Sequence, residues 1–342
     1  MLLITCADDY LGYCITSHLS QSAALCSDMR VLCQETNTKL PWLCNFAKKG
    51  IDVLPVNPEH PNHLSKAMRN IDQVILIMSN HTDRVAHCRR ICNAASKSGV
   101  QSIIFLSHQG AQSEQHQALY DYGLVENHLV SKQQQQQDMN WVILRLEFIQ
   151  QYFHLWSHQV EVSGAMSLPL NSDTELCPID ISDVGAVIAA FVLQQDGSFA
   201  ACLNEYHAGQ VYTLTGPEAV TSKSIVSMMS DATMYKLHRY LKVRLMDTAY
   251  YLRDLRRNIW FDERLKKERS AVYTDQEEYG YRTKALCLPH DVQIQTFLDY
   301  FDWINKTSSS VHVEHVEVIT KAKSRTLQAY FHENAISFKP RV

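Results

Sequence analysis

The residue types most suggestive of chemistry lie in a short turn near the amino end, directly after the apolar run Met1–Thr5. In folds that bind dinucleotides, the first strand leads into a turn with three glycines, and the free amides of the next helix hold the pyrophosphate. Here that spacing falls on Cys6, Asp9 and Gly12, so only the last position keeps its glycine. We expect Gly12 to let helix and strand pack closely, whereas the other two side chains narrow the space for a phosphate.

Two adjacent carboxylates, Asp8 and Asp9, add negative charge to this turn. They would repel a pyrophosphate. They would equally suit a helix that binds none, because carboxylates can cap the free amides of a helix and complement its dipole. We favour a turn stabilised by its own carboxylates, and a working phosphate site remains the alternative.

The end of the second predicted strand bears on the choice of cofactor. An acidic residue there holds the ribose hydroxyls of NAD, whereas an arginine accepts the extra phosphate of NADP. The candidates are Gln34 and Glu35. Neither favours NADP, and Glu35 would either hold a ribose or lie solvated in a loop.

Acid–base chemistry by a tyrosine is a further possibility to weigh. Hydride transfer of the dehydrogenase type uses a tyrosine whose pKa is lowered by a lysine one helical turn away. Tyr120 and Tyr122 instead have Leu124 and Glu126 at that spacing. We predict that Tyr122 packs or lines a cleft, and that the chain has no catalytic residue of this kind.

Two other classes of chemistry lack their sequence patterns. His87, Cys88 and Cys92 share one predicted helix, but they form neither a Cys-x-x-Cys pair nor a His-Glu-x-x-His pattern. We therefore predict no metal site. No Gly-x-Ser-x-Gly turn marks a hydrolase nucleophile.

The elements that must position these residues follow a regular rhythm over the first 150 residues. Short apolar runs predict strands over 1–5, 29–33, 51–56, 73–78, 102–106 and 141–146. Longer periodic segments between them predict helices over 11–25, 41–49, 61–70, 84–98 and 120–132. Strands that alternate with helices indicate an α/β fold with a doubly wound parallel sheet, which is Rossmann-like.

The pattern loosens after residue 150 and predicts a smaller C-terminal α+β lobe. A strand is expected over 211–215, with helices over 184–195, 222–229, 248–268 and 291–305. We divide the chain into a dinucleotide-binding core (1–155), a substrate or partner lobe interleaved with it (156–305) and a C-terminal appendage (306–342).

Composition excludes several classes of protein. The chain of 342 residues has 32 Lys and Arg against 36 Asp and Glu, a net charge of −4 that offers no overall attraction to nucleic acid or anionic lipid. No apolar stretch approaches the roughly 18 residues of a membrane span. Ten scattered cysteines and the absence of a charged leader predict a cytoplasmic protein without disulfides.

Several segments together resemble the NmrA-like family of atypical short-chain dehydrogenase/reductase folds, over residues 1–305. The most specific of them is Tyr212–Ala219, which reads Tyr-Thr-Leu-Thr-Gly-Pro-Glu-Ala. The other matching segments are 2–5, 10–12, 30–32, 105–107, 110–111, 125–129, 141–145, Phe148 and 179–184.

The resemblance implies a Rossmann domain, a small C-terminal lobe and a cofactor cleft between them. It also implies that members are either NADPH-linked reductases or non-enzymatic sensors that bind nicotinamide dinucleotides and contact transcription factors. The family pattern places cofactor contacts at Thr5, Ala7, Asp8, Asp9, Tyr10, Leu11, Gly12, Gln34, Asn57, Ser79, Ser107 and Glu147.

This chain departs from the family pattern at several of its functional positions. Gln34 replaces the arginine usual for NADP, and Asn57 replaces an aspartate after the third strand. Tyr122 stands at the position of the reductases' lysine, and Leu146 replaces a proline. We therefore expect NAD(P) binding weakened by Cys6, Asp8, Asp9 and Gln34. The expected function is a nucleotide-sensing or transcription-regulator type of binding protein without efficient hydride transfer, and an NAD(P)H-dependent oxidoreductase is the alternative.

One segment is the first candidate for a partner surface. Residues 248–269 combine an apolar stripe with many charged side chains around Trp260 and Phe261. We favour an amphipathic helix with a solvated face. If a regulatory protein of the transcription-factor class binds the chain, we expect it to bind there, with no direct contact to nucleic acid or membrane. The chain is expected to act as a monomer or homodimer in the cytoplasm, with the nucleus as a second location.

Overall fold

The computed structural model describes residues 1–135, 139–255, 280–284, 286–307 and 312–340. The chain divides into two compact units. Unit 1 comprises Met1–Gln112, Tyr120–Arg145 and Val184–Thr213. Unit 2 comprises Ser113–Leu119, Leu146–Asp183 and Leu214–Val342.

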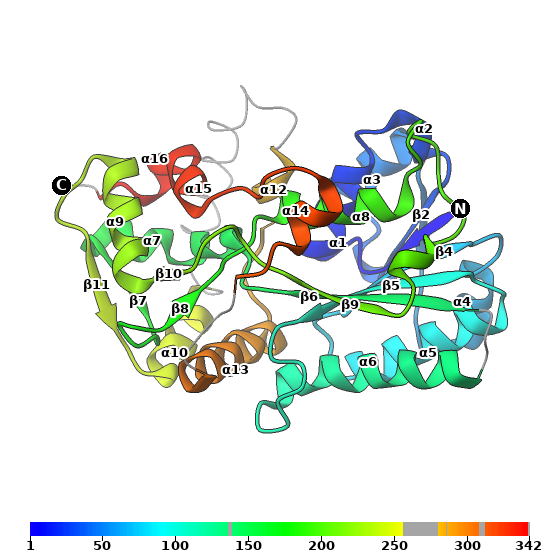
Figure 1. The fold of residues 1–342 in the computed structure, drawn as a ribbon, viewed down its shortest axis with the longest axis horizontal. Coiled ribbons are helices and arrows are strands. Elements are labelled where there is room, and N and C mark those ends of the chain that lie inside the picture. Colours follow the sequence, from blue (N-terminus) through cyan, green and yellow to red (C-terminus); the bar gives the residue numbers. More distant parts are fainter. Residues whose placement is uncertain (136–138, 256–279, 285, 308–311, 341–342) are drawn as a thin grey trace. The chain divides into compact units, whose positions relative to one another are not determined.

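A seven-stranded sheet with the order β3-β2-β1-β4-β5-β6-β9 forms the centre of unit 1 (Figure 1). Its strands are β1 (Leu2–Ile4), β2 (Met29–Cys33), β3 (Asp52–Pro55), β4 (Gln73–Ile77), β5 (Ser102–His108), β6 (Asn140–Leu146) and β9 (Gln210–Leu214). Ile4 is paired in parallel register with Val31 on one side and with Ile75 on the other. The strand order therefore reverses between β1 and β4, which confirms the predicted doubly wound parallel sheet.

The strand predicted over 211–215 has a different place from the one expected. It is β9, and it extends the large sheet beside β6 instead of belonging to the smaller lobe. The sequence did not predict the pairing of β9 with β6, which lie far apart in the chain. A strand's neighbours in a sheet are set by the path of the chain and not by the strand's own composition.

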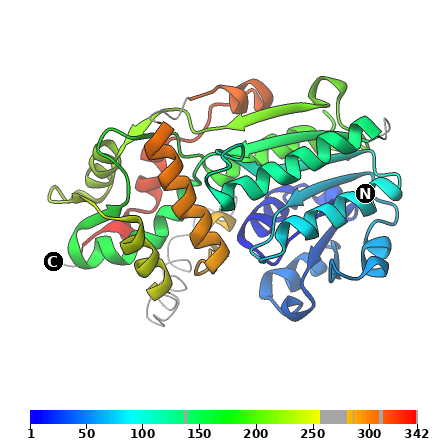
Figure 2. The ribbon, with the colours of Figure 1, turned by 90° about the horizontal axis from the view of Figure 1, so that it is seen from below.

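Helices cover both faces of this sheet (Figure 2). On one face lie α1 (Tyr10–Leu19), α3 (Pro41–Lys48) and α8 (Ile181–Val192), and on the other lie α5 (Arg84–Lys97) and α6 (Gln117–Gln135). The remaining helices of this part are α2 (Ala23–Cys26) and α4 (Pro61–Ala67), with short 3-10 turns at Glu35–Asn37 and Glu205–His207. The predicted helix over 11–25 is interrupted, because Ser20 ends α1 and Ser22 is the N-cap residue of α2.

The core of unit 1 lies between β4, β5 and the helices α5 and α6. Every residue of β4 is buried, and Leu76 and Phe105 are among those fully buried. Cys92 of α5 and Leu129 of α6 pack into the same cluster. The buried strands position the loops that follow their carboxyl ends.

Unit 2 combines short strands with helices, as an α+β lobe requires. A parallel pair is formed by β7 (Ala165–Leu168) and β11 (Arg239–Lys242), and an antiparallel pair by β8 (Glu175–Leu176) and β10 (Val220–Thr221). Its described helices are η2 (Gln150–Trp156), α7 (Ser157–Ser163), α9 (Ser222–Thr233), α10 (Leu245–Leu255), α12 (Tyr281–Lys284), α13 (Asp291–Thr307), α14 (His315–Thr320), α15 (Leu327–Glu333) and α16 (Ala335–Phe338). Within the described ranges, no helix is both long and apolar enough to cross a membrane.

The C-terminal segment is part of the packed core of unit 2, which corrects the expected peripheral appendage. Tyr330, Phe331 and Phe338 are buried, and the ring of Phe331 contacts that of Phe153 at 6.0 Å between centroids. Arg282 also links this segment to the rest of unit 2, because it donates to Glu333 of the segment and to Asp180, at 2.8 Å each. The aromatic residues of the C-terminal segment are therefore core residues. The sequence did not indicate this, because charged residues lie between them.

Candidate functional site

The turn after β1 keeps the backbone geometry of a glycine-rich turn although glycine is missing from its first position. Cys6 has a positive φ of 55°, in the left-handed region that favours glycine. A Cβ on Gly12 would lie 2.1 Å from the carbonyl oxygen of Cys6, so only glycine allows this close approach of α1 to the turn. The expected packing role of Gly12 is therefore confirmed, and Cys6 holds a strained conformation beside it.

Thr5 and Cys6 join β1 to β4 at the point where the strand order reverses. The hydroxyl of Thr5 donates to the carbonyl of Ile77 at 3.0 Å and accepts from the N–H of Ile77 at 2.8 Å. The thiol of Cys6 donates to the same carbonyl at 3.3 Å. Burial, followed by the charges of Asp9 and Asp8, raises the pKa of the Cys6 thiol well above its usual value, so it stays protonated at neutral pH.

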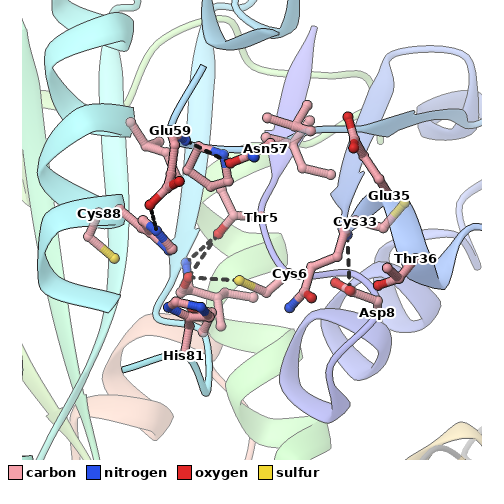
Figure 3. Close-up of a pocket in the computed structure, with 18 residues that line it drawn as sticks. Thr5, Cys6, Asp8, Cys33, Glu35, Thr36, Asn57, Glu59, His81 and Cys88 are labelled. Carbon is pink, nitrogen blue, oxygen red and sulfur yellow. Dashed lines mark hydrogen bonds and ion pairs between the residues drawn. The ribbon is translucent and has the colours of Figure 1, made fainter. Parts of the chain in front are cut away.

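The two carboxylates of the turn have different environments. Asp9 is the N-cap residue of α1, but its side chain makes no capping hydrogen bond to the helix. Asp8 does not cap α1 as expected: its carboxylate accepts from the backbone N–H of Gln34 at 3.0 Å (Figure 3). It also accepts from Nδ2 of Asn37 at 2.8 Å. Because these donors follow β2, the side chain of Asp8 links the turn to the next loop of the sheet.

A cavity of about 320 Å³ opens at the carboxyl ends of β1, β2, β3 and β4, beside α5 (Figure 3). Five of the expected cofactor residues line it, namely Thr5, Asp8, Gln34, Asn57 and Ser79. The other lining residues are Cys6, Leu32, Cys33, Glu35, Thr36, Val56, Pro58, Glu59, Ile77, His81, His87, Cys88 and Ile91. In doubly wound sheets, ligands bind in the crevice at this reversal of strand order.

The charged lining of the cavity is acidic. Asp8, Glu35 and Glu59 contribute carboxylates, and the lining contains no lysine or arginine. His81 and His87 face each other with ring centroids 4.8 Å apart. Burial, and then the charges of His81 and Arg90, lowers the pKa of His87, so this imidazole is neutral at pH 7.

Two buried polar atoms in the lining have no hydrogen-bond partner among the described residues. They are Oγ of Ser79 and Nε2 of His87. Oε1 of Glu59 lies 4.0 Å from this nitrogen, beyond hydrogen-bond range. Because buried polar groups are normally paired, these two atoms are available to a polar ligand.

Several expected cofactor residues lie outside the cavity. Ala7, Tyr10 and Gly12 are buried in the turn and in α1. Leu11 of α1 and Asp9 likewise do not line the cavity.

Ser107 and Glu147, two further expected cofactor residues, each have a protein partner. Ser107 is buried and donates to Glu126 at 2.5 Å, and Arg145 holds both oxygens of the same carboxylate at 3.0 and 2.6 Å. Glu147 belongs to unit 2, where the buried hydroxyl of Tyr300 donates to it.

Tyr122, at the position of the family lysine, is packed and does not line the cavity. Burial raises the pKa of its hydroxyl. The guanidinium of Arg84 lies 5.2 Å from the centroid of its ring and pairs with Asp121 at 3.0 Å. A tyrosine with a raised pKa is a poor acid or base at neutral pH.

Sequence reasoning missed Glu59, His81 and Ile91 as lining residues, and it considered His87 and Cys88 only as metal ligands. The signal that could have found them is position, since Glu59 follows β3 and His81 follows β4. Loops at the carboxyl ends of neighbouring parallel strands share one edge of the sheet.

The expected partner surface lies largely outside the described residues. Of 248–269, the structure describes the part within α10, which ends at Leu255. Residues 256–269, with Trp260 and Phe261, are not among the described ones.

The sequence matches one family of known proteins over part of its length. Residues 37–195 match the model of a family described as NAD(P)H-binding. The match begins beyond the altered turn at residues 5–12 and includes Asn57, Ser79 and His87 of the cavity.

Three similar proteins are named as reductases, and each has low sequence identity to this chain. An NAD(P)H azoreductase of Xenophilus azovorans is 23% identical over 197 residues, which cover 58% of this chain and 63% of the azoreductase's length. An NADPH-dependent quinone oxidoreductase of Escherichia coli, complexed with NADPH, has a TM-score of 0.69 at 16% identity, covering 97% of this chain and 98% of the other. A Citrobacter sp. triphenylmethane reductase complexed with NADP(H) has a TM-score of 0.70 at 14% identity, covering 98% and 100%. The resemblance noted in the sequence is thus confirmed: the chain has an NAD(P)H-binding sequence pattern over residues 37–195 and the fold of the NmrA-like, atypical short-chain dehydrogenase/reductase type.

Proposed function

We propose that this protein binds NAD(H) in the cavity at the carboxyl ends of β1 to β4 and acts as a nucleotide-sensing binding protein without efficient hydride transfer. The observation that carries the proposal is the cavity itself, with its acidic lining and its two unpaired polar atoms. NAD(H) supplies a hydride donor or acceptor at its nicotinamide ring when it is bound.

The residues present fit the adenosine half of the cofactor. The carboxylate of Glu35, at the end of β2, is suited to accept from ribose hydroxyls, as an acidic residue does at this position in NAD-binding folds. Oγ of Ser79 and Nε2 of His87 provide two further polar contacts. The 2′-phosphate of NADP would meet carboxylates without a lysine or arginine in the lining, so NAD(H) is favoured over NADP(H).

The phosphate turn supports weak rather than tight binding. Cys6 and Asp9 occupy positions where a close backbone approach to a pyrophosphate requires glycine. The carboxylate of Asp8 lines the same cavity and would repel the negative charges of a pyrophosphate (Figure 3). A sensor that responds to changing dinucleotide levels needs an affinity near those levels, which such a turn would provide.

Titration of the purified protein with NAD⁺, NADH, NADP⁺ and NADPH, followed by calorimetry, tests the proposal. NAD⁺ or NADH should bind at least about tenfold more tightly than its phosphorylated counterpart. Glu35→Ala should weaken this binding by about tenfold, while Glu218→Ala, which removes an exposed carboxylate outside the cavity, should leave it unchanged. Absence of binding by all four dinucleotides, or a preference for NADPH, would overturn the proposal.

An NAD(P)H-dependent oxidoreductase is the second candidate, and the azoreductase relative is the observation in its favour. Against efficient turnover stands Tyr122, which has neither a lysine neighbour nor a place in the cavity. Steady-state assays with azo dyes and quinones should give rates below about 0.01 s⁻¹, far under the usual 1–10³ s⁻¹ of enzymes. Rates within that usual range would establish the oxidoreductase and contradict the sensor.

A regulatory protein of the transcription-factor class, bound through 248–269, remains the proposed partner of this sensor. The support is the mixed-charge composition of this segment, together with Tyr250 and Arg253, which are exposed on α10. Substitution of Tyr250 by Ala should weaken capture of that partner without changing dinucleotide affinity, because Tyr250 is not part of the cavity.

A further inference from the structure

A second surface with a distinct chemistry lies on the small parallel sheet of unit 2. This sheet consists of β7 and β11, and β11 has no neighbouring strand on its outer side among the described residues (Figure 1). Three residues of β11 are exposed, in contrast to β7, which is buried throughout. An exposed strand edge of this kind can pair with another chain.

The hydrogen bonds to β7 establish which backbone groups are free. The N–H of Arg239 donates to the carbonyl of Gly164 at 2.9 Å, and the N–H of Val243 donates to that of Leu168 at 3.2 Å. Because backbone groups alternate in direction along a strand, those of Tyr240 and Lys242 point to the opposite edge. Within the described part of the chain, neither residue has a backbone partner there.

The free edge is positively charged. Residues 236–244 contain no acidic side chain and four basic ones: Lys236, Arg239, Lys242 and Arg244. Asp231 neutralises Lys236 and Asp247 neutralises Arg244, each at 2.9 Å. Arg239 has no ion-pair partner among the described residues, and Lys242 donates to the uncharged amide of Asn171 at 2.7 Å.

Apolar side chains flank these charges. Leu237 is 71% exposed and Leu241 is 45% exposed. Leu241 is on the same face of the strand as Arg239, and Leu237 lies in the turn before β11. The strand thus offers apolar contact, positive charge and unpaired backbone groups together.

We propose that the outer edge of β11 binds an extended, acidic segment of a partner protein, which adds to the sheet as a third strand. Backbone hydrogen bonds to Tyr240 and Lys242 would provide affinity, and alternate side chains would provide selectivity. Carboxylates on one face of the added strand would face Lys242, and the apolar residues on its other face would cover Leu241. Arg239, at the start of β11, would attract the acidic segment through its charge. A second copy of β11 is disfavoured as the occupant, because an antiparallel pair would bring like charges opposite each other.

The test uses the full chain and a fluorescein-labelled peptide of alternating Glu and Val residues, followed by fluorescence anisotropy. A peptide of alternating Lys and Val is the matched control for charge. The acidic peptide should bind at least about tenfold more tightly, and its affinity should fall as salt rises. Equal binding of the two peptides would overturn the proposal.

Variants separate backbone pairing from charge. Lys242→Pro removes an outward N–H while leaving the bonds to β7, and Lys242→Ala removes the same side chain but keeps that N–H. Lys242→Pro should bind the acidic peptide at least about fivefold more weakly than Lys242→Ala, and Arg239→Glu should weaken it by a similar factor. Equal affinity of the two Lys242 variants would show that the edge is not used.

Hydrogen exchange on the unmodified protein tests the proposal even if the proline variant does not fold. The amides of Tyr240 and Lys242 should exchange rapidly in the free protein and slow at least about tenfold when the acidic peptide is added. Protection before any peptide is added would overturn the proposal, as would self-association in ultracentrifugation that competes with the peptide. Adding the acidic peptide should not change the affinity for NADH. Failure of peptide binding at β11 can therefore be distinguished from failure of dinucleotide binding in the cavity.

Discussion

The carboxylate of Asp8 accepts a hydrogen bond from the backbone N–H of Gln34 at 3.0 Å, which joins the turn after β1 to the loop after β2 (Figure 3). A negatively charged side chain therefore links the two loops at the place where a pyrophosphate would bind. Asn37 supplies a second donor to the same oxygen, so this charge is anchored at the cavity and not free to turn away.

Removal of this charge should strengthen dinucleotide binding. Asp8→Asn keeps the shape of the side chain and an oxygen that can accept from Gln34, and it removes the repulsion of a pyrophosphate. NADH affinity measured by calorimetry should rise about fivefold. Asp173→Asn, an exposed substitution with the same change in net charge, should have no effect. Unchanged affinity in Asp8→Asn would mean that the side chains at positions 6 and 9 are the barrier.

The positive φ of Cys6 predicts that glycine is better than alanine at this position. Both Cys6→Gly and Cys6→Ala lose the thiol contact to Ile77, so their difference isolates the strain of a Cβ at a φ of 55°. In urea denaturation, Cys6→Gly should be more stable than Cys6→Ala by about 1 kcal/mol.

The same pair of substitutions at Cys44 provides the control. Cys44 is exposed and lies within the helix α3, where glycine is less stable than alanine by about 1 kcal/mol. The sign of the difference should therefore be opposite at the two positions. The same sign at both would refute the assignment of strain to Cys6.

Cofactor choice should respond to Gln34. An arginine at this position would offer a charged, planar donor to a 2′-phosphate in a lining that has no lysine or arginine. Gln34→Arg should raise NADPH affinity about tenfold relative to NADH. Gln34→Met, which has similar length and no charge, should leave the ratio of the two affinities unchanged, and a shift in both variants would show that side-chain volume decides it.

Asp183 predicts a pH dependence of stability. Burial, and then the charge of Asp180, raises the pKa of Asp183 to about 7. Because an unfolded aspartate titrates near 4, the folded protein keeps this proton to a higher pH. The stability associated with it is present in full below about pH 4 and is lost as the pH rises toward 7.

Asp183→Asn should therefore remove this loss. The amide oxygen can still accept from the N–H of Arg325, which donates to the carboxylate at 2.8 Å. Between pH 5 and pH 8, the free energy of unfolding of the variant should rise by about 2 kcal/mol relative to the wild type. Asp173→Asn should show no such trend, and a difference for Asp183→Asn that is constant with pH would contradict the raised pKa.

The sequence by itself determined the class of fold and the character of the turn. Apolar runs alternating with helices predicted the parallel sheet, because buried parallel strands must be apolar along their whole length. The lone Gly12 predicted close packing of α1, which the 2.1 Å distance from its would-be Cβ to the carbonyl of Cys6 confirms. These features depend on local geometry that residue type dictates.

Only the tertiary structure decided which side chains meet. Ser107 lies near the end of β5 and Glu147 directly follows β6, but Glu126 and Tyr300, remote in sequence, pair with them. His87 and Glu59 meet at the cavity because α5 and the loop after β3 converge there. Such pairings depend on long-range packing, and the burial of Phe331 and Phe338 in the C-terminal segment shows the same dependence. A side chain's partner across the fold is set by the path of the whole chain, which no local pattern specifies.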